Sequence, residues 1–185
     1  MKIHTHRVMK DLSLGGVVFA MTMASGVCQA QPLAPLPEGV KAVWDMTKAY
    51  RETTPTRERV CINGLWRWQP ADAKSDQVPG DKWGYFKVPG CWPGITDYMQ
   101  KDFQTVHAHP SWKDENLGGV TAAWYQREVA IPREWNGRRL AVYAEYLSSF
   151  AAVFVDGKKA GEIRFPAGEV DLTAICRPGS KHVLS

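Results

Sequence analysis

The chain has 185 residues, enough for one ordinary domain or two small ones, and 44% of them are hydrophobic while 23% are charged. That balance is typical of a globular protein and excludes a disordered chain. The formal net charge is only +4 and no basic stripe concentrates it, so we expect no nucleic-acid partner. A (β/α)₈ barrel needs roughly 250 residues and is excluded by length.

Residues 1–30 have the pattern of an export signal. Three basic residues precede the uncharged residues 12–27, and the small-residue exit Cys28-Gln29-Ala30 follows. The apolar run is shorter than the roughly 20 residues that span a membrane. We therefore predict a cleaved signal peptide, a periplasmic or extracellular location and no stable membrane span. The Pro-rich residues 31–57 are predicted as an extended leader.

From residue 58 onward, short strand patterns alternate with turn signals such as Asn136-Gly137 and Asp156-Gly157. In residues 122–131, Arg127 shares its side of the strand with apolar residues. The long segment 91–117 is predicted as a functional or poorly ordered loop. The predicted strands are residues 65–68, 85–88, 122–131, 139–146, 150–155, 158–163, 169–172 and 181–185. Because no long amphipathic helix interrupts them, the fold class is predicted to be all-β, a jelly-roll β-sandwich.

Six segments, in order, make residues 58–185 similar to the sugar-binding domain of glycoside hydrolase family 2. They are Asn63-Gly64-Leu65-Trp66-Arg67-Trp68, Val88-Pro89-Gly90-Cys91-Trp92, Trp124–Arg127 with Ile131–Arg139, Ala152–Gly157, Gly168–Thr173, and Gly179–Leu184. Two departures are Asp156, where Asn is commoner in the family, and the Trp- and His-containing loop 91–117. The resemblance implies a galactose-binding-domain-like jelly roll. The last predicted strand stops at Ser185, so we expect the domain to be incomplete at its C-terminus.

The family includes β-galactosidases, β-glucuronidases and β-mannosidases, in which an immunoglobulin-like domain and a catalytic (β/α)₈ barrel follow the sugar-binding domain. The resemblance implies that the parent enzyme hydrolyses β-linked glycosides by double displacement, with both catalytic glutamates beyond Ser185. This chain would then be its non-catalytic part, with carbohydrate and the downstream domains as partners. Two alternatives stay open: a stand-alone exported carbohydrate-binding module, and a decayed gene fragment.

The residues support no catalytic assignment. A retaining glycosidase needs two carboxylates about 5–5.5 Å apart with different pKa values. The candidate carboxylates are predicted to be solvated surface groups; they are Asp114, Glu115, Glu128, Glu134 and Glu145. The sequence contains no P-loop, serine-nucleophile motif or dinucleotide fingerprint, so no cofactor is expected.

Metal and disulfide chemistry are weakly indicated. His107 and His109 have the spacing of two ligands on one strand face, but no third ligand is obvious and no metal site is predicted. Three cysteines, Cys61, Cys91 and Cys176, follow the predicted signal peptide. An odd number allows either three small buried thiols or one disulfide with a free thiol, and the pairing stays open.

Aromatic side chains are the candidate carbohydrate contacts, because their faces stack on the C–H edges of sugar rings. Trp92, Tyr98 and Trp112 lie in the long loop and are the residues we expect to make such contacts. An alternative for the loop is packing against the neighbouring barrel. Four other tryptophans, Trp66, Trp68, Trp124 and Trp135, are predicted at strand positions, in the core or at a sheet edge.

Overall fold

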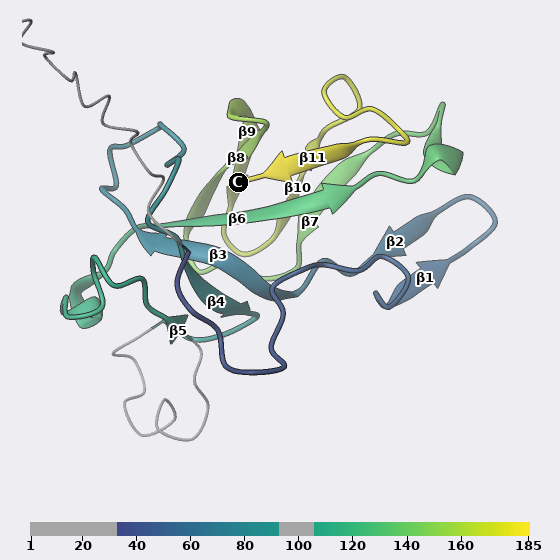
Figure 1. Cartoon of the computed structure of the whole chain (residues 1–185). Helices are drawn as coiled ribbons and strands as arrows, with labels where there is room; N and C mark the ends of the chain where they lie inside the picture. The colour runs from purple at the N-terminus through teal and green to yellow at the C-terminus, as the bar shows by residue number, and fades with distance from the viewer. Residues whose placement is uncertain (1–32, 93–105) are drawn as a thin grey trace, which may run out of the picture.

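The computed structural model describes residues 33–92 and 106–185, and the predicted signal peptide and Tyr98 lie outside these ranges (Figure 1). The described chain is all-β, with only two short 3₁₀ helices, η1 (Leu117–Gly119) and η2 (Arg133–Trp135). Its strands are β1 (Arg51–Thr53), β2 (Glu58–Val60), β3 (Gly64–Pro70), β4 (Gly84–Val88), β5 (Val106–His107), β6 (Ala123–Ala130), β7 (Ala141–Ala144), β8 (Phe150–Val155), β9 (Lys158–Arg164), β10 (Gly168–Asp171) and β11 (Lys181–Leu184). No helix in the described ranges is long and apolar enough to cross a membrane.

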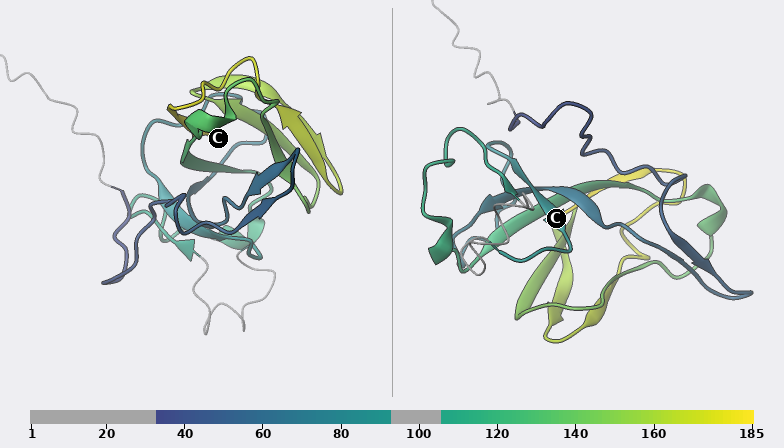
Figure 2. Two further views of the ribbon diagram at one scale, coloured as in Figure 1. Left: turned by 90° about the vertical axis from the view of Figure 1, so that its right-hand side faces the viewer. Right: turned by 90° about the horizontal axis from the view of Figure 1, so that it is seen from below.

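The main sheet has seven strands in the order β5-β4-β3-β6-β11-β8-β9, and each pairing is antiparallel. Strand β6 joins the two halves of the sheet. Its residues 123–126 pair with β3, and its residues 127–130 pair with β11. Two further pairs, β7 with β10 and β1 with β2, lie outside the main sheet. Figure 2 shows that the main sheet is curled rather than flat.

Three apolar clusters form the core. The largest lies against β6, β8, β9, β10 and β11 and comprises Val129, Leu140, Val153, Val155, Ile163, Val170, Leu172, Cys176 and Leu184. The second contains Trp68, Phe86 and Trp112, and the third contains Trp83, Trp124 and Phe154. Since β6 contributes residues to the first and third clusters and packs Tyr125 against the second, it connects all three.

The predicted strands from residue 65 onward are confirmed, with small differences at their ends. The Asp156-Gly157 turn joins β8 to β9, and both residues have positive φ angles, 49° and 78°. That geometry is required by the type I′ turn that Asp-Gly favours. Burial confirms Trp68 and Trp124 as core residues.

Three features differ from the sequence prediction. Strand β5 lies inside residues 91–117, which were predicted as a loop, because its two residues pair with β4. Trp135 belongs to η2, not to a strand, because Pro132 ends the extended segment and the chain turns at once. A hairpin of β1 and β2 begins inside residues 31–57, where only an extended leader was predicted. Strand β1 is exposed along its whole length, so its residues lack the apolar alternation that identifies a strand.

Candidate functional site

The structure gives Trp112, one of the three predicted carbohydrate contacts, a packing role. Its side chain is only 6% exposed, and its ring meets Trp68 edge-on with centroids 5.5 Å apart. Its Nε1–H donates a 2.8 Å hydrogen bond to the carbonyl of Lys82. With its face in the core and its polar edge used, Trp112 has no ring surface left for a sugar.

Gly84 in β4 explains how Trp112 reaches the core. A Cβ at this position would lie 2.5 Å from the Trp112 ring and 2.5 Å from the carbonyl oxygen of His107. A side chain there would push both groups away. The sequence shows the glycine, but not that an indole fills the space beside it.

Trp92 is half-buried, and its Nε1–H donates a 2.5 Å hydrogen bond to the hydroxyl of Tyr125. Tyr125 meets Phe86 edge-on at 5.6 Å, so the Trp92 ring is fixed to the second cluster. Burial raises the pKa of Tyr125, which keeps the hydroxyl neutral. Sugar contact by Trp92 stays a prediction.

The candidate carboxylates are all exposed, which confirms the predicted surface role; they are Asp114, Glu115, Glu128, Glu134 and Glu145. Glu128 forms a surface ion pair of 2.7 Å with Lys181. Glycosidic acid–base chemistry needs one carboxyl in a dry environment that raises its pKa. The exposure of these five groups does not provide that environment.

His107 and His109 do not lie in a cluster of three or more potential ligands, and none was found among residues 33–92 and 106–185. His109 is fully buried, and its Nδ1 accepts a hydrogen bond from the N–H of Ser111 at 3.1 Å. Its ring therefore anchors the turn that carries Trp112. Burial lowers the pKa of His107.

The thiols of Cys61, Cys91 and Cys176 are unpaired in the structure. Cys176 is buried in the largest cluster, and burial raises the pKa of its thiol. Cys91 is exposed and Cys61 is half-buried, so the alternative of three buried thiols holds for Cys176 alone. No two of these three sulfur atoms are bonded to each other, so the structure shows no disulfide among them.

Asp156 and His182 form a network that the sequence analysis missed. Nε2 of His182 accepts the Arg177 N–H at 2.9 Å, so the ring proton lies on Nδ1 and points to Asp156 Oδ2 at 2.7 Å. Asp156 Oδ1 accepts the Val183 N–H at 2.8 Å. These hydrogen bonds, first that from Val183 and then that from His182, lower the pKa of Asp156. Because both ring nitrogens are occupied, His182 holds the β8–β9 turn against β11 and is not a free general base.

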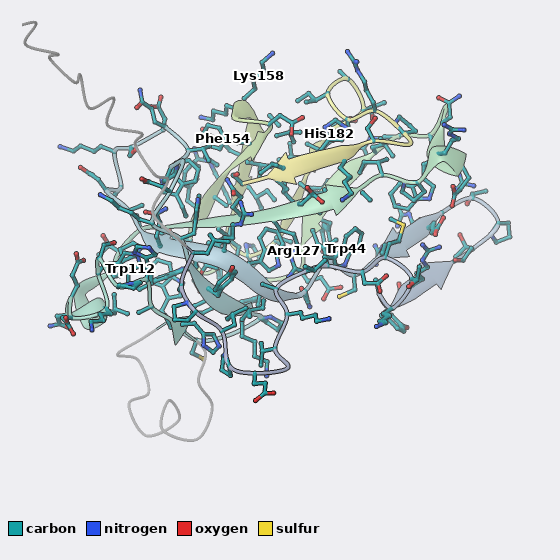
Figure 3. All side chains as sticks on the ribbon, in the orientation of Figure 1. Trp44, Trp112, Arg127, Phe154, Lys158 and His182 are labelled. Atoms are coloured by element: carbon teal, nitrogen blue, oxygen red, sulfur yellow. The ribbon has the colours of Figure 1, made fainter. Side chains whose placement is uncertain are left out.

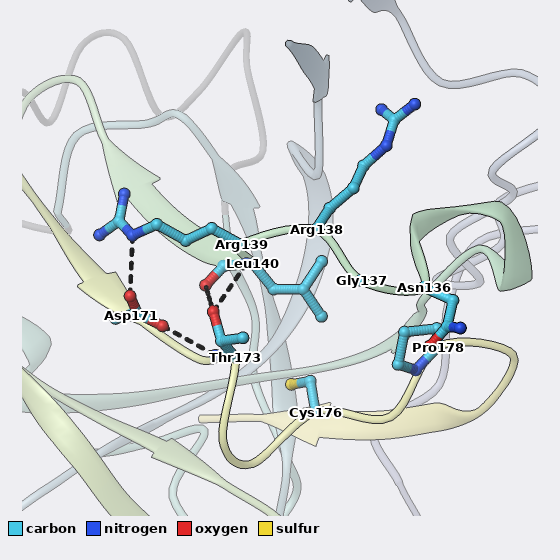
Figure 4. A pocket seen from close by; sticks show the side chains of 9 residues that line it. All are labelled: Asn136, Gly137, Arg138, Arg139, Leu140, Asp171, Thr173, Cys176 and Pro178. Atoms are coloured by element: carbon cyan, nitrogen blue, oxygen red, sulfur yellow. Dashed lines mark hydrogen bonds and ion pairs between the residues drawn. The ribbon is translucent and has the colours of Figure 1, made fainter. Parts of the chain in front are cut away.

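A surface pocket of about 450 Å³ lies between the loop before β7 and the end of β10 (Figure 4). Arg139 lies on its rim and forms 2.8 Å ion pairs with Asp171 and Glu169. Hydrogen bonds from Thr173, followed by that from Arg139, lower the pKa of Asp171 to about 2. These ion pairs join the loop before β7 to β10, and Arg138 adds a second guanidinium to the lining of the pocket.

Arg127 is the most unusual charged residue of the described chain because it is buried without a carboxylate partner (Figure 3). Its Nη1 donates to the carbonyls of Ile62 and Asn63 at 2.9 and 2.8 Å, and its Nη2 donates to that of Leu65 at 2.5 Å. The guanidinium also lies over the Trp66 ring, 5.2 Å from its centroid. Burial lowers its pKa to about 10, so it stays charged at neutral pH. Arg127 thus fixes the turn that leads into β3.

Comparison with known proteins identifies relatives of one kind. The β-glucuronidase of Paenibacillus borealis is 24% identical over 72% of this chain and 21% of its own length. That of Felis catus is 26% identical over 61% of this chain and 17% of its own length. No protein-family model matches the chain.

Solved structures agree on the fold. The β-glucuronidase of Faecalibacterium prausnitzii superposes with a TM-score of 0.52 at 19% identity, over 73% of this chain and 21% of that one. That of Dictyoglomus thermophilum gives a TM-score of 0.50 at 18% identity, over 73% and 20%. The predicted resemblance to glycoside hydrolase family 2 is confirmed by β-glucuronidases that align with 61–72% of this chain. The two solved structures share its fold over 73% of the chain. The chain spans about a fifth of the length of the curated relatives it matches.

Proposed function

We propose that residues 58–185 form the non-catalytic, galactose-binding-like jelly-roll domain at the N-terminus of a secreted family 2 glycoside hydrolase. The observation that carries this proposal is the match itself. β-Glucuronidases align with 61–72% of this chain, yet the chain accounts for only 17–21% of them. A region of that size can supply one domain of such an enzyme.

In this proposal, the complete enzyme hydrolyses β-linked O-glycosyl bonds with two glutamates that lie outside the chain. Residues 58–185 contribute carbohydrate contacts and a surface for the immunoglobulin-like and barrel domains. Residues 1–30 direct export to the periplasm or beyond and are then removed. The exposure of the five candidate carboxylates supports a role without catalysis for this part.

The mass of the native gene product tests the proposal. Peptides from residues 140–175, or an antibody against them, would identify the product in the producing cell. A product far above 20.7 kDa is expected, with β-glycosidase activity in the same fraction. A product of about 17–18 kDa, the mass left after signal removal, would instead indicate a stand-alone carbohydrate-binding module.

A further inference from the structure

A row of polar side chains crosses four neighbouring strands of the main sheet on one face. Residues directly opposite each other in paired strands point to the same face, so the register fixes the row. Arg67 of β3 lies opposite both Gln126 of β6 and Tyr85 of β4. Tyr85 in turn lies opposite His107 of β5. Ser185 extends the row beyond β6, because its hydroxyl accepts a 3.3 Å hydrogen bond from Gln126 Nε2.

This row lies on the face of the sheet that points away from the largest and the second apolar clusters. Side chains alternate between the two faces along a strand. Trp66 and Trp68, the neighbours of Arg67 in β3, pack in those two clusters, and so does Phe86, the neighbour of Tyr85 in β4. Arg67 is exposed. The row is therefore directed outward, and its central guanidinium reaches solvent.

Two cations on this face have no carboxylate partner among the described residues. Arg67 uses one N–H donor for the amide oxygen of Gln126, at 2.9 Å, and has further donors left. Lys87 lies on the same face of β4 and is exposed. Neither cation forms an ion pair within residues 33–92 and 106–185, and Glu128, on the same face of β6, is paired with Lys181. The face therefore offers positive charge to an anionic ligand.

Neutral hydrogen-bonding groups lie beside these cations. The Tyr85 residue is only 6% exposed, but its hydroxyl has no partner in the described chain and is not one of the buried unpaired polar atoms there. The hydroxyl is therefore open to solvent. Burial raises its pKa, and the charge of Arg67 opposes that shift, so the hydroxyl stays a neutral donor and acceptor. Burial lowers the pKa of His107, whose neutral ring also has one donor and one acceptor.

The spacing of these groups fits an extended, hydroxyl-rich chain. Neighbouring strands lie about 5 Å apart, so the groups on β5, β4 and β3 repeat at about the length of one pyranose ring. Neutral donors and acceptors at that repeat can pair with ring hydroxyls, which fix the orientation of a bound sugar. The two unpaired cations in addition require acidic groups on the ligand, since a charged hydrogen bond is the stronger kind.

We propose that this row binds an extended oligosaccharide whose rings carry carboxylates. Arg67 and Lys87 bind the carboxylates, and Gln126 holds the guanidinium in position. The hydroxyl of Tyr85 and the imidazole of His107 bind the sugar hydroxyls. The inference rests on the proposed carbohydrate-binding role and assigns it to a face of the main sheet, not to the aromatic side chains of residues 91–117.

Two trisaccharides that differ only at C6 test this site. One is β-1,4-linked mannuronate, which carries a carboxylate on each ring, and the other is β-1,4-linked mannotriose, which carries none. Each is titrated into the full chain and followed by amide chemical shifts. We expect shifts at residues 65–68 and 84–88, with the neutral sugar binding at least about threefold more weakly. Added salt should weaken the binding of mannuronate and leave that of mannotriose unchanged.

Single substitutions separate the two kinds of group. Lys87→Met should weaken mannuronate binding about twofold to fivefold and leave mannotriose binding unchanged. Tyr85→Phe keeps the buried ring and removes only the hydroxyl, so it should weaken the binding of both sugars about twofold to tenfold. Lys158→Met is the matched control, because it removes the same charge from β9, at the opposite edge of the sheet. It should bind both sugars as the unchanged protein does.

Several outcomes overturn the site. Equal binding of the two sugars removes it, as does an equal loss in Lys158→Met. Shifts confined to the surroundings of Trp92 would overturn this site but leave the proposed carbohydrate-binding function standing. If neither sugar shifted any amide of the folded chain, the site and the proposed carbohydrate contacts would both fall. A tetraglutamate peptide that bound as tightly as mannuronate would show that the face binds an acidic protein surface instead.

Discussion

At the scale of single residues, Arg127 is the side chain on which the turn before β3 depends most. Three carbonyls accept hydrogen bonds from it, and Arg127→Met should remove this donor from all three, while that of Ile62 keeps its 2.9 Å hydrogen bond from Trp66 Nε1. Each orphaned group costs about 1–3 kcal/mol, and partial relaxation gives an expected loss of about 3 kcal/mol in the free energy of unfolding. Urea denaturation at neutral pH measures this loss.

Arg139→Met is the control for this experiment, because Arg139 forms exposed ion pairs with Glu169 and Asp171. Exposed pairs contribute little to stability because water and salt screen them. If both variants lost the same small amount of stability, the buried hydrogen bonds of Arg127 would not hold the turn. The alternation of residues 122–131 shows that an arginine lies on the apolar side of the strand. It does not reveal the partners, because backbone carbonyls leave no trace in a sequence pattern.

Asp156 is the second residue whose role the structure makes testable. Asn suits a left-handed turn as well as Asp does. In Asp156→Asn, however, the side-chain NH₂ replaces one of the two accepting oxygens. It would face either the Nδ1–H of His182 or the N–H of Val183, and one of the two hydrogen bonds would be lost. We expect a loss of about 1 kcal/mol at pH 7, allowing for the exposure of the carboxylate. Thermal unfolding of both proteins measures the difference.

The pH dependence of this difference follows from the lowered pKa of Asp156. A carboxyl whose pKa is lower in the folded state stabilises the fold above its unfolded pKa of 3.8, and that contribution is lost as the pH falls through the folded value. The stability difference between the two proteins should therefore be steady above about pH 5 and shrink below about pH 4. A difference that stays constant down to pH 2 would contradict the network.

At the scale of secondary elements, the space between β6 and β8 is the most informative feature. The N–H of Ile131 donates to the carbonyl of Ser180, and its carbonyl accepts from the N–H of Gly179. Backbone groups of alternate residues along a strand point to the same side, so the amides of Ala123 and Tyr125 also point toward this space. Phe154 and Ser185 exchange two backbone hydrogen bonds, each N–H donating to the other's carbonyl. By the same alternation, the amides of Phe150 and Ala152 point toward this space. Strand β11 pairs only with residues 127–130 of β6 and Val155 of β8.

Hydrogen exchange should show this open space. Within the described ranges, no strand accepts the inward amides of Ala123, Tyr125, Phe150 and Ala152. They should exchange at least about tenfold faster than those of Trp124, Gln126, Ala151 and Val153, which face β3 and β9. Equal protection of the two sets, measured by NMR at neutral pH, would mean that another segment fills the space.

The sequence predicts elements well where alternation and turn residues agree, as in β8, the Asp156-Gly157 turn and β9. It fails where tertiary contacts replace that pattern. Strand β1 has no buried residue, so only its pairing with β2 identifies it. Trp112 looks like an exposed loop residue until Gly84, 28 positions earlier in the chain, is seen to make room for its ring. Arg67 and Tyr85 look like unrelated residues of two strands, because only the pairing of β3 with β4 places them side by side.

At the scale of the whole molecule, the three apolar clusters share β6, so we expect the described region to unfold as one cooperative unit. The largest cluster includes Ile163 of β9, at the far edge of the sheet from β4 and β5. The second and third clusters contain the fully buried Trp68 and Trp83. Loss of packing around Ile163 must therefore affect tryptophans in other clusters if the clusters are coupled.

Ile163→Ala tests this coupling, since truncation of a buried Ile costs about 2–5 kcal/mol. For a chain of this length that corresponds to a Tm lower by roughly 5–15 °C. The same shift is expected in tryptophan fluorescence and in far-UV circular dichroism, while the exposed Lys158→Ala should melt within about 2 °C of the unchanged protein. Trp44, Trp66 and Trp135 pack against the largest cluster, so a fluorescence transition that split into a shifted and an unshifted part would divide the molecule at β6. Strand β6 would then join two independent halves. Arg127, which fixes the turn before β3, and the network of Asp156 and His182 would stabilise separate halves.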